Sequence, residues 1–303
     1  MTGANATGTT CENGDRLYDE PMTTVGVVVV TYRSSATIEG CLRSLRAATA
    51  TNAQVVVVDN ASDDDSAEVA SALGATVIRR DTNAGFGAGC NEGVRALDPS
   101  TEFVLFANPD TTWPLDQVDA LIREAKSDPS VGLISPTLVD ENNTTQPIVE
   151  DDLALGRVLR GMTRLGAAIR PRVPSEPKEL EDVEWLHMAA ALVPMSVVHE
   201  TGGFDERFFM FGEDADFCRR VRGLGRRVVV SPRVFVTHIG GASVDGSHDA
   251  DQAAGLRTRA LALYLEKYQG VAARRVFGLV GAVVYSAARH RGQAREAWKA
   301  LVG

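Results

Sequence analysis

The chain has 303 residues, 44% of them hydrophobic, and a formal net charge of -9. This length allows one large α/β domain or two modest ones with a full core. The four cysteines lie far apart without a CxxC pair, which argues against a cysteine metal site or a disulfide framework and favours a reducing, cytosolic setting. Residues 1–22 lack the basic start and apolar core of a signal peptide, and their polar composition predicts a disordered tail.

The charge is unevenly distributed along the chain. Residues 255–303 hold nine Lys and Arg against two Glu, a balance of +7, which leaves -16 on the remainder. An acidic body disfavours nucleic-acid binding. Within the basic tail, residues 276–288 form an apolar run that is shorter than the roughly 20 residues of a membrane span. The tail therefore predicts either a helix on an anionic membrane surface or a core-packing helix with a solvated basic face.

Strands and helices alternate in the first part of the chain. Apolar runs predict buried strands, and apolar positions at helical spacing predict the helices between them. The strands are expected at 25–31, 54–58, 76–79 and 103–107, and the helices at 38–48, 66–73 and 89–97. This order predicts an α/β fold with βαβ units and a mostly parallel sheet that has helices on both faces.

The pattern changes after residue 110. Residues 141–182 are rich in Asn, Thr, Glu and Pro, and they predict a mobile loop region with a helical insert at 153–169. The chain is expected to return to the sheet at 184–194. The remaining elements are helices at 113–126 and 214–223 and strands at 132–139, 227–230 and 234–238.

The strand at 103–107 runs directly into Asn108-Pro109-Asp110. Proline has no N–H to donate to a sheet, so the strand must end there and leave Asp110 at the edge where open α/β sheets bind ligands. A carboxylate in this place can bind a metal ion or a sugar hydroxyl. The alternative is that Asp110 only caps the following helix.

Three other segments follow predicted strands and are expected at the same edge. Residues 31–34 precede a helix and suit a nucleotide, although the dinucleotide fingerprint GxGxxG is missing there. Asp59 can accept hydrogen bonds from a base or a ribose, with Ser62 or Asp63 capping the next helix, and capping alone is the alternative. Residues 83–89 supply three glycines, so that backbone N–H groups can approach a ligand closely.

Two later features carry further ionisable groups. An aromatic run at 208–211 leads into Glu213, Asp214 and Asp216 at a predicted helix start. Acids stabilise a helix N-terminus without any catalytic role, but aromatic neighbours would also raise a carboxyl pKa and favour a general base. His238 ends the last predicted strand, where it is either structural or a metal ligand.

The chain resembles the inverting glycosyltransferases of family 2, which have the GT-A fold. The resemblance covers about residues 24–245 and rests on VVVVTYRS, VVDNAS, NAGFGAGCNEG, LFANPD, GGFDERFFMFGEDADFCRR and the late His238, in this order. Within the family, the chain is most similar to rhamnosyltransferases of bacterial cell-wall and polysaccharide assembly, especially the actinobacterial enzyme that acts on N-acetylglucosaminyl-diphospho-decaprenol.

This resemblance implies roles for individual residues. Asn108 and Asp110 match the DxD motif with Asn in the first place, so Asp110 and His238 are the expected protein ligands of Mg²⁺ or Mn²⁺. The base is expected to be Asp214 of the Glu213-Asp214 pair. Trp185 and His187 are weaker candidates for the acceptor site, and Trp185 suits the core equally well. The residues expected around the nucleotide sugar are Thr31, Tyr32, Arg33, Asp59, Asn60, Asn83, Gly85, Phe86, Gly87, Asn91 and Asn108.

The resemblance also implies an activity and an organisation. The expected reaction is inverting transfer of L-rhamnose from dTDP-rhamnose to N-acetylglucosamine on a polyprenyl diphosphate, in the synthesis of the arabinogalactan–peptidoglycan linker. A GT-A domain at 23–245 would be followed by a helical extension at 246–303, which associates peripherally with the inner face of the cell membrane. Whether the protein forms a homo-oligomer is left open.

Three alternatives stand beside this expectation. The first is a family 2 transferase with another donor, such as a UDP-sugar or a galactofuranose nucleotide. The second is a sugar nucleotidyltransferase, although its usual Gly-rich loop with Arg or Lys is absent after Val30. The third is a non-catalytic binding module, which would not need both Asp110 and the Glu213-Asp214 pair in a cleft.

Overall fold

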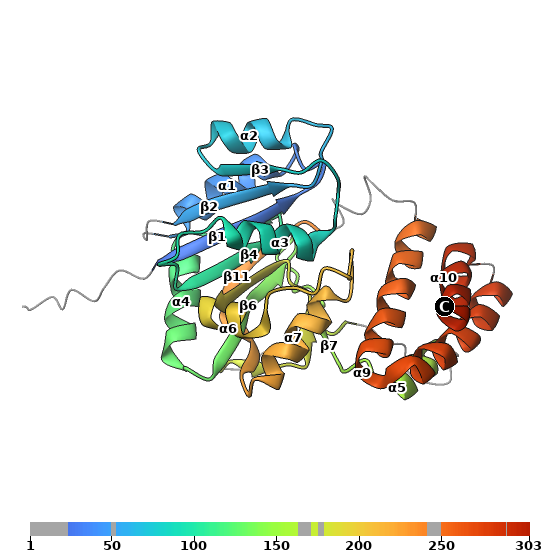
Figure 1. Cartoon of the computed structure of the whole chain (residues 1–303). Coiled ribbons are helices and arrows are strands. Elements are labelled where there is room, and N and C mark those ends of the chain that lie inside the picture. Colours follow the sequence, from blue (N-terminus) through green and yellow to red (C-terminus); the bar gives the residue numbers. More distant parts are fainter. Residues whose placement is uncertain (1–23, 50–52, 163–170, 175–178, 241–249, 289) are drawn as a thin grey trace, which may run out of the picture.

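The computed structural model describes residues 24–49, 53–162, 171–174, 179–240, 250–288 and 290–303 (Figure 1). The predicted tail at 1–22 lies outside these residues. The first four strands confirm the sequence prediction. They are β1 (Val25–Thr31), β2 (Gln54–Asp59), β3 (Thr76–Arg79) and β4 (Phe103–Ala107), and they pair with one another in parallel.

The main sheet has nine strands among the described residues, in the order β3-β2-β1-β4-β10-β6-β11-β5, with β8 paired to β11. β10 (Ala190–Pro194) runs antiparallel between β4 and β6 (Val131–Val139), and β11 (Arg227–His238) runs parallel to β6. The carboxyl ends of β1, β2, β4, β6 and β11 therefore lie along one edge, named here the carboxyl edge.

The two strands predicted at 227–230 and 234–238 are one strand in the structure. β11 is continuous, but its register against β6 shifts between Ser231 and Phe235. Pro232 lies within the shift and has no N–H for the ladder, so a bulge accommodates it. The prediction of two separate strands was therefore wrong, but the predicted gap between them coincides with the shift in register.

Helices cover both faces of the sheet in Figure 1. They are α1 (Ile38–Ala47), α2 (Ser66–Ala72), α3 (Phe86–Arg95), α4 (Gln117–Ser127), α6 (Met195–Thr201) and α7 (Glu213–Gly223). In α1, the buried side chains Ile38, Cys41, Leu42 and Leu45 follow helical spacing and form one apolar stripe. α3 packs closely on β1, because a Cβ at Gly93 would lie 2.4 Å from Val28 Cγ1.

The region predicted as a mobile loop contains regular elements among its described residues. β7 (Val149–Glu150) pairs with β9 (Trp185–Leu186), and β8 (Glu181–Asp182) pairs with β11. The predicted helical insert is present as α5 (Leu155–Met162), while 163–170 and 175–178 lie outside the described residues. Pairing with distant strands explains why composition alone did not indicate these elements.

The C-terminal helices α9 (Ala250–Ala287) and α10 (Arg291–Val302) lie beside the sheet and its helices in Figure 1. Gly270 interrupts α9 with φ 86° and ψ 170°. The second part of α9 contacts α10 closely, because a Cβ at Gly278 would lie 2.5 Å from the backbone nitrogen of Leu301. By length and hydropathy alone, Asp251–Ala287 is the one described helix that could cross a membrane, and Gly270 breaks its helical backbone.

Candidate active site

Asp110 and His238 meet at the carboxyl edge. Asp110 follows β4, is 4% exposed, and its Oδ1 has no hydrogen-bond partner. His238 ends β11 and places its Nε2 3.5 Å from that oxygen. α4 begins at Gln117, with Asp116 at its N-cap, so the alternative in which Asp110 caps the following helix is wrong. The short strand β5 (Thr111–Thr112), paired to β11, occupies the start of the predicted helix.

Gln146 fixes the orientation of His238. The side-chain Nε2 of Gln146 donates to the backbone carbonyl of His238 (2.6 Å), and His238 Nδ1 lies 2.9 Å from Gln146 Oε1. An amide oxygen only accepts, so Nδ1 carries the proton and the Nε2 lone pair faces Asp110. Burial lowers the pKa of His238 despite the opposing effect of Asp110, which favours the neutral ring that binds metals. No sequence signal pointed to Gln146.

These two side chains fit a divalent cation whose remaining ligands come from a substrate. Among the described residues, no cluster of three or more His, Cys, Asp or Glu forms a complete metal cage. Asp110 offers an unsatisfied carboxylate oxygen and His238 an imidazole nitrogen, which suit Mg²⁺ or Mn²⁺ with additional oxygen ligands. The phosphates of a nucleotide sugar are such ligands.

Unsatisfied polar atoms also lie at the ends of β1 and β2. Thr31 Oγ1 and Asn60 Oδ1 are buried without a hydrogen-bond partner, and Asp59 beside them is 3% exposed. Buried polar atoms are usually hydrogen-bonded, so these atoms point to a bound polar ligand. Asn108 is only partly buried and its backbone N–H donates to Ala189.

The loops after β1 and β2 are joined by hydrogen bonds and an ion pair. Ser62 Oγ accepts from the backbone of Arg33, whose guanidinium pairs with Asp63 (2.7 Å) and lies 5.2 Å from the Tyr32 ring centroid. The expectation that Ser62 or Asp63 caps the next helix is therefore wrong, since Asp64 accepts from the N–H of Ser66 instead. Arg33 is thus held at the end of β1 by a neighbouring loop.

The Gly-rich loop is fastened to the aromatic run that precedes Glu213. Gly85 has φ 93°, and a Cβ there would lie 1.8 Å from the carbonyl oxygen of Phe209. The next N–H, of Phe86, donates to the same oxygen (3.2 Å). Asn83 Oδ1 accepts from Gly85, and Asn60 Nδ2 donates to the Gly85 carbonyl. A residue without a side chain is required at 85, because the two segments approach too closely for any other.

Asn91 and Gly87 pack against a different segment. The Asn91 side chain accepts from the Phe204 N–H (2.8 Å) and donates to the Phe204 carbonyl and to Glu206 (both 2.9 Å). A Cβ at Gly87 would lie 3.0 Å from Phe204 Cβ. Asn91 therefore anchors the turn before α7. Its position near the Gly-rich loop in the sequence had suggested a contact with the nucleotide sugar and did not indicate this anchoring role.

The Glu213-Asp214 pair starts α7 at the carboxyl edge. The Met188 N–H donates to Asp214 Oδ2 (3.3 Å). Burial raises the pKa of Asp214 to about 6, against the opposing effects of His187 and the Met188 hydrogen bond. Glu213 is 5% exposed with Oε2 unsatisfied, and burial together with the Asp214 charge raises its pKa well above the usual range. Asp214 is therefore the better placed of the two to exchange a proton near neutral pH.

His187 and Trp185 lie next to Asp214 in the chain that returns to the sheet. His187 Nε2 is 3.0 Å from Glu150 Oε1, and the two rings of His187 and Trp185 have centroids 5.6 Å apart. Burial lowers the pKa of His187, but the Glu150 hydrogen bond and the Asp214 charge outweigh it and raise the pKa overall. Trp185 Nε1 donates to the carbonyl of Asp151 (2.9 Å). Glu150 was not indicated by the sequence.

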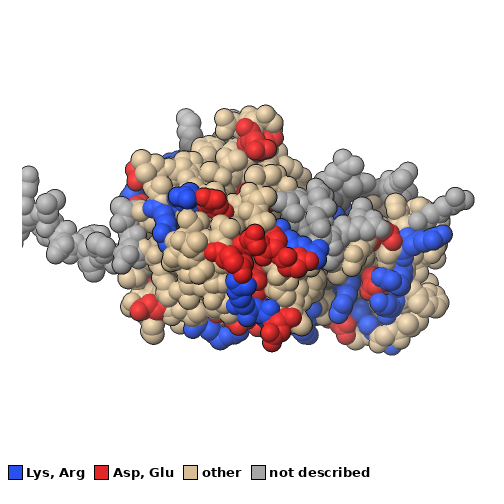
Figure 2. Space-filling view, turned by 90° about the horizontal axis from the view of Figure 1, so that it is seen from above, with Lys and Arg blue, Asp and Glu red and all other residues tan. Residues whose placement is uncertain are grey.

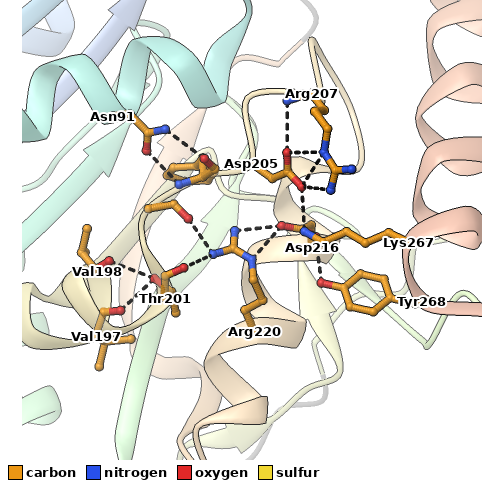
Figure 3. Close-up of polar contacts among 12 residues, drawn as sticks. Asn91, Val197, Val198, Thr201, Asp205, Arg207, Asp216, Arg220, Lys267 and Tyr268 are labelled. Atoms are coloured by element: carbon orange, nitrogen blue, oxygen red, sulfur yellow. Dashed lines mark hydrogen bonds and ion pairs between the residues drawn. The ribbon is translucent and has the colours of Figure 1, made fainter.

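Asp216, the third acid of the predicted helix start, is fully buried and has a different set of partners, which Figure 3 shows. Its carboxylate pairs with Arg220 (2.8 Å) and Lys267 and accepts from the Tyr268 hydroxyl (2.8 Å). Lys267 also pairs with Asp205 (2.7 Å). Asp216 therefore links α7 to α9. The spacing of the three acids in the sequence did not distinguish this structural role from the roles of Glu213 and Asp214.

Comparisons with known proteins agree with this geometry. The family model described as glycosyl transferase family 2 matches residues 26–170. The N-acetylglucosaminyl-diphospho-decaprenol L-rhamnosyltransferase of Mycobacterium tuberculosis is 31% identical over 232 residues, which cover 70% of this chain and 75% of that protein. The low-salt glycan biosynthesis hexosyltransferase Agl10 of Haloferax volcanii is 27% identical over 215 residues, which cover 70% of this chain and 65% of that protein.

Solved structures give the same answer for the fold. The mannosyltransferase PcManGT of Pyrobaculum calidifontis, solved with GDP-Man and Mn²⁺, superposes with a TM-score of 0.55 at 18% identity and covers 91% of this chain and 73% of its own. The glucosyl-3-phosphoglycerate synthase of Mycobacterium tuberculosis gives 0.53 at 18% identity, over 81% of this chain and 80% of its own. The predicted GT-A fold is thus confirmed, and the chain belongs to glycosyltransferase family 2.

Proposed function

We propose that this glycosyltransferase transfers L-rhamnose from dTDP-rhamnose to N-acetylglucosamine carried on a polyprenyl diphosphate, in assembly of a cell-wall linker. The observation that carries the proposal is the 31% identity, over three quarters of its length, to a relative with that printed activity. The geometry supports it, because the carboxyl edge carries Asp110 and His238, which would bind a metal ion, and the start of α7 carries Asp214, a carboxylate of raised pKa.

The donor would bind at the ends of β1, β2 and β4. Thr31, Asp59 and Asn60 offer buried polar atoms for the base and ribose, and the loop at 83–87 offers backbone near the diphosphate. Tyr32, Arg33 and Asn108 lie at the same strand ends. Asp110 and His238 would hold Mg²⁺ or Mn²⁺, an ion that stabilises negative charge on a leaving diphosphate.

Asp214 would act as the base. It accepts the proton of the acceptor hydroxyl while the oxygen bonds to the anomeric carbon and the bond from that carbon to the diphosphate breaks. A single displacement inverts the anomeric centre, so a β-linked donor gives an α-rhamnoside. Burial and the neighbouring Asp214 charge raise the pKa of Glu213 well above its usual range, which makes it the less suitable of the two carboxyl groups to act as the base.

The C-terminal helices would hold the enzyme at the inner face of the membrane. On the second part of α9, Val276, Leu279 and Val283 repeat at helical spacing and are 43%, 54% and 64% exposed. Lys and Arg gather over these helices on the right of Figure 2, which suits an anionic lipid surface. In this proposal residues 23–245 form the transferase domain and 246–303 the membrane-binding extension.

A transfer assay with the full chain tests the proposed reaction. Nucleotide sugars are offered one at a time with a synthetic polyprenyl-diphosphate N-acetylglucosamine, in Mg²⁺, Mn²⁺ or EDTA. We expect dTDP-rhamnose to give an α-rhamnoside only when metal is present. Transfer from a UDP-sugar or a galactofuranose nucleotide instead would assign another donor, and acceptance of aqueous saccharides alone would refute the lipid acceptor.

Two substitutions separate the proposed roles within the same assay. Asp214→Asn is expected to bind the donor normally and to lose turnover by about 100-fold or more, since a positioned base contributes that much. Asp110→Asn is expected to weaken metal-dependent donor binding. Unchanged turnover in Asp214→Asn would sink the base assignment.

A further inference from the structure

α9 brings an arginine from the C-terminal extension to the catalytic side of the molecule. The Arg257 guanidinium carbon lies 4.5 Å from the ring centroid of Phe211, and Phe211 precedes the Glu213-Asp214 pair by two residues. The positive charge of Arg257 also opposes protonation of His187, so the two side chains are within electrostatic reach of each other. Arg257 therefore lies against the segment that leads into the Glu213-Asp214 pair and within electrostatic reach of the acceptor candidate His187.

The position of Arg257 is fixed by contacts further along the same helix. A Cβ at Gly212 would lie 3.3 Å from Ala260, and Lys267 pairs with the buried Asp216. Tyr264, between them, is buried and lies 4.8 Å from the Tyr268 ring by centroids. These residues recur at helical spacing, so one face of α9 is packed against α7 and the turn before it.

Arg257 itself stays exposed and has no ion-pair partner among the residues that the structure describes. The other cations near this interface are paired, because Lys267 binds two aspartates and Arg219 lies against Asp152 (3.4 Å). Contact with an aromatic face holds a guanidinium in place without neutralising it. A fixed, unneutralised guanidinium is suited to recognise phosphate oxygens.

We propose that Arg257 binds the diphosphate of the lipid-linked acceptor, so that the C-terminal extension supplies part of the acceptor site. This inference rests on the proposed function and adds a residue to it. The donor diphosphate has its own candidates at Asp110 and His238, which would hold its metal ion, whereas Arg257 lies at Phe211 and near His187. Beyond the break at Gly270, α9 carries the exposed apolar stripe at Val276, Leu279 and Val283, so the proposed phosphate contact and the proposed lipid contact both belong to the C-terminal extension.

The test compares two acceptors in the full chain. N-acetylglucosamine is presented either on a short polyprenyl diphosphate or as an uncharged alkyl glycoside, and kcat/KM is measured for each with wild type and Arg257→Gln. Arg259→Gln is the matched control, because Arg259 is also exposed on α9 but lies two residues further, on another side of the helix. Donor affinity and the unfolding temperature of each variant are measured as well.

We expect Arg257→Gln to lower kcat/KM for the diphosphate acceptor by about 10- to 100-fold, mainly through KM, as for a lost charged hydrogen bond. The uncharged acceptor, the donor affinity and Arg259→Gln should stay close to wild type, and Arg257→Lys should recover part of the loss. An equal loss with both acceptors, or none with either, would overturn the proposal. Failure of the proposed function is distinct, because wild type itself would then not use the diphosphate acceptor.

Discussion

At the scale of single residues, the assignment of Asp214 as the base predicts how activity depends on pH. Burial raises the pKa of this carboxyl to about 6, and only the ionised form can accept the proton of the acceptor hydroxyl. We therefore expect kcat/KM to rise about tenfold per pH unit below pH 6 and to level off above it. A pH profile of transfer at saturating metal measures this. A flat profile between pH 5 and 7 would contradict the assignment.

The same pKa has a consequence for stability. The folded-state pKa lies above the unfolded value, so ionisation of Asp214 costs stability as the pH rises from about 4 to about 6. At pH 7, Asp214→Asn should thus be as stable as wild type or more stable by about 1 kcal/mol, although it loses turnover. Urea unfolding at pH 7 measures the difference, and strong destabilisation would show that the ionised carboxylate has a structural role.

Gln146 acts through His238 and is a positioning residue. Replacement by Met should release the imidazole ring, and loss of such a supporting contact typically weakens metal binding by about 10- to 100-fold. Titration of Mn²⁺ into the protein with nucleoside diphosphate, followed by calorimetry, measures this without turnover. Gln269→Met is the control, because the Gln269 side-chain amide also makes two hydrogen bonds, to the backbone groups of Leu153 and Leu155, away from β11. Equal affinities in the two variants would contradict the role of Gln146.

At the scale of elements, the link from Asp216 to Lys267 and Tyr268 holds α7 against α9 of the extension (Figure 3). Removal of one partner of a buried ion pair leaves the other charge uncompensated. Because Lys267 is about one-fifth exposed and Arg220 also pairs with Asp216, we expect Lys267→Met to lower the free energy of unfolding by about 1–3 kcal/mol. Kcat should fall with it, since α7 carries Asp214.

Lys299→Met provides the matched comparison for this prediction. Lys299 pairs with Glu296 on the surface of the same extension and is 63% exposed, so its loss should change stability by less than about 0.5 kcal/mol. Chemical denaturation of both variants separates the buried link from the exposed pair. Equal effects would mean that the contact between α7 and α9 contributes little.

The elements also show where the sequence was informative. Runs of valine, such as Val27–Val29 and Val56–Val58, predict strands buried on both faces, and the structure places them in the parallel part of the sheet. The motifs directly follow these strands, so the sequence alone could predict that the motif residues lie at the carboxyl edge. The start of α4 could not, because pairing between β5 and β11 decides it over a long sequence separation.

At the scale of the whole molecule, the residues that sequence analysis missed share one property. Gln146, Glu150, Arg257 and Lys267 contribute through partners far along the chain, in segments that have no motif of their own. Asp110, Asp214 and His238 could be predicted because strand ends and a helix start determine their direction locally. The composition of the tail indicated a basic amphipathic extension, but it did not indicate that this extension contacts α7.

If the extension binds the membrane as proposed, changes in its apolar stripe should release the whole enzyme from lipid vesicles. Replacement of Leu279 and Val283 by Asp puts two charges into the exposed apolar stripe and should abolish binding to vesicles that contain phosphatidylglycerol. Wild-type binding should weaken with added salt and with neutral lipid, because the basic side chains of the extension supply the electrostatic part. Vesicle cosedimentation measures both effects.

Leu115→Asp is the control for this surface. Leu115 is 69% exposed but lies in the transferase domain, before α4, so its replacement should leave vesicle binding unchanged. Transfer to the uncharged alkyl acceptor should stay at the wild-type level in Leu279→Asp/Val283→Asp, since the stripe lies beyond Gly270 while Arg257 and Lys267 lie before it. Vesicle binding that survives the double substitution would place the membrane contact elsewhere, and loss of transfer to both acceptors would show that the stripe supports the fold of the extension instead.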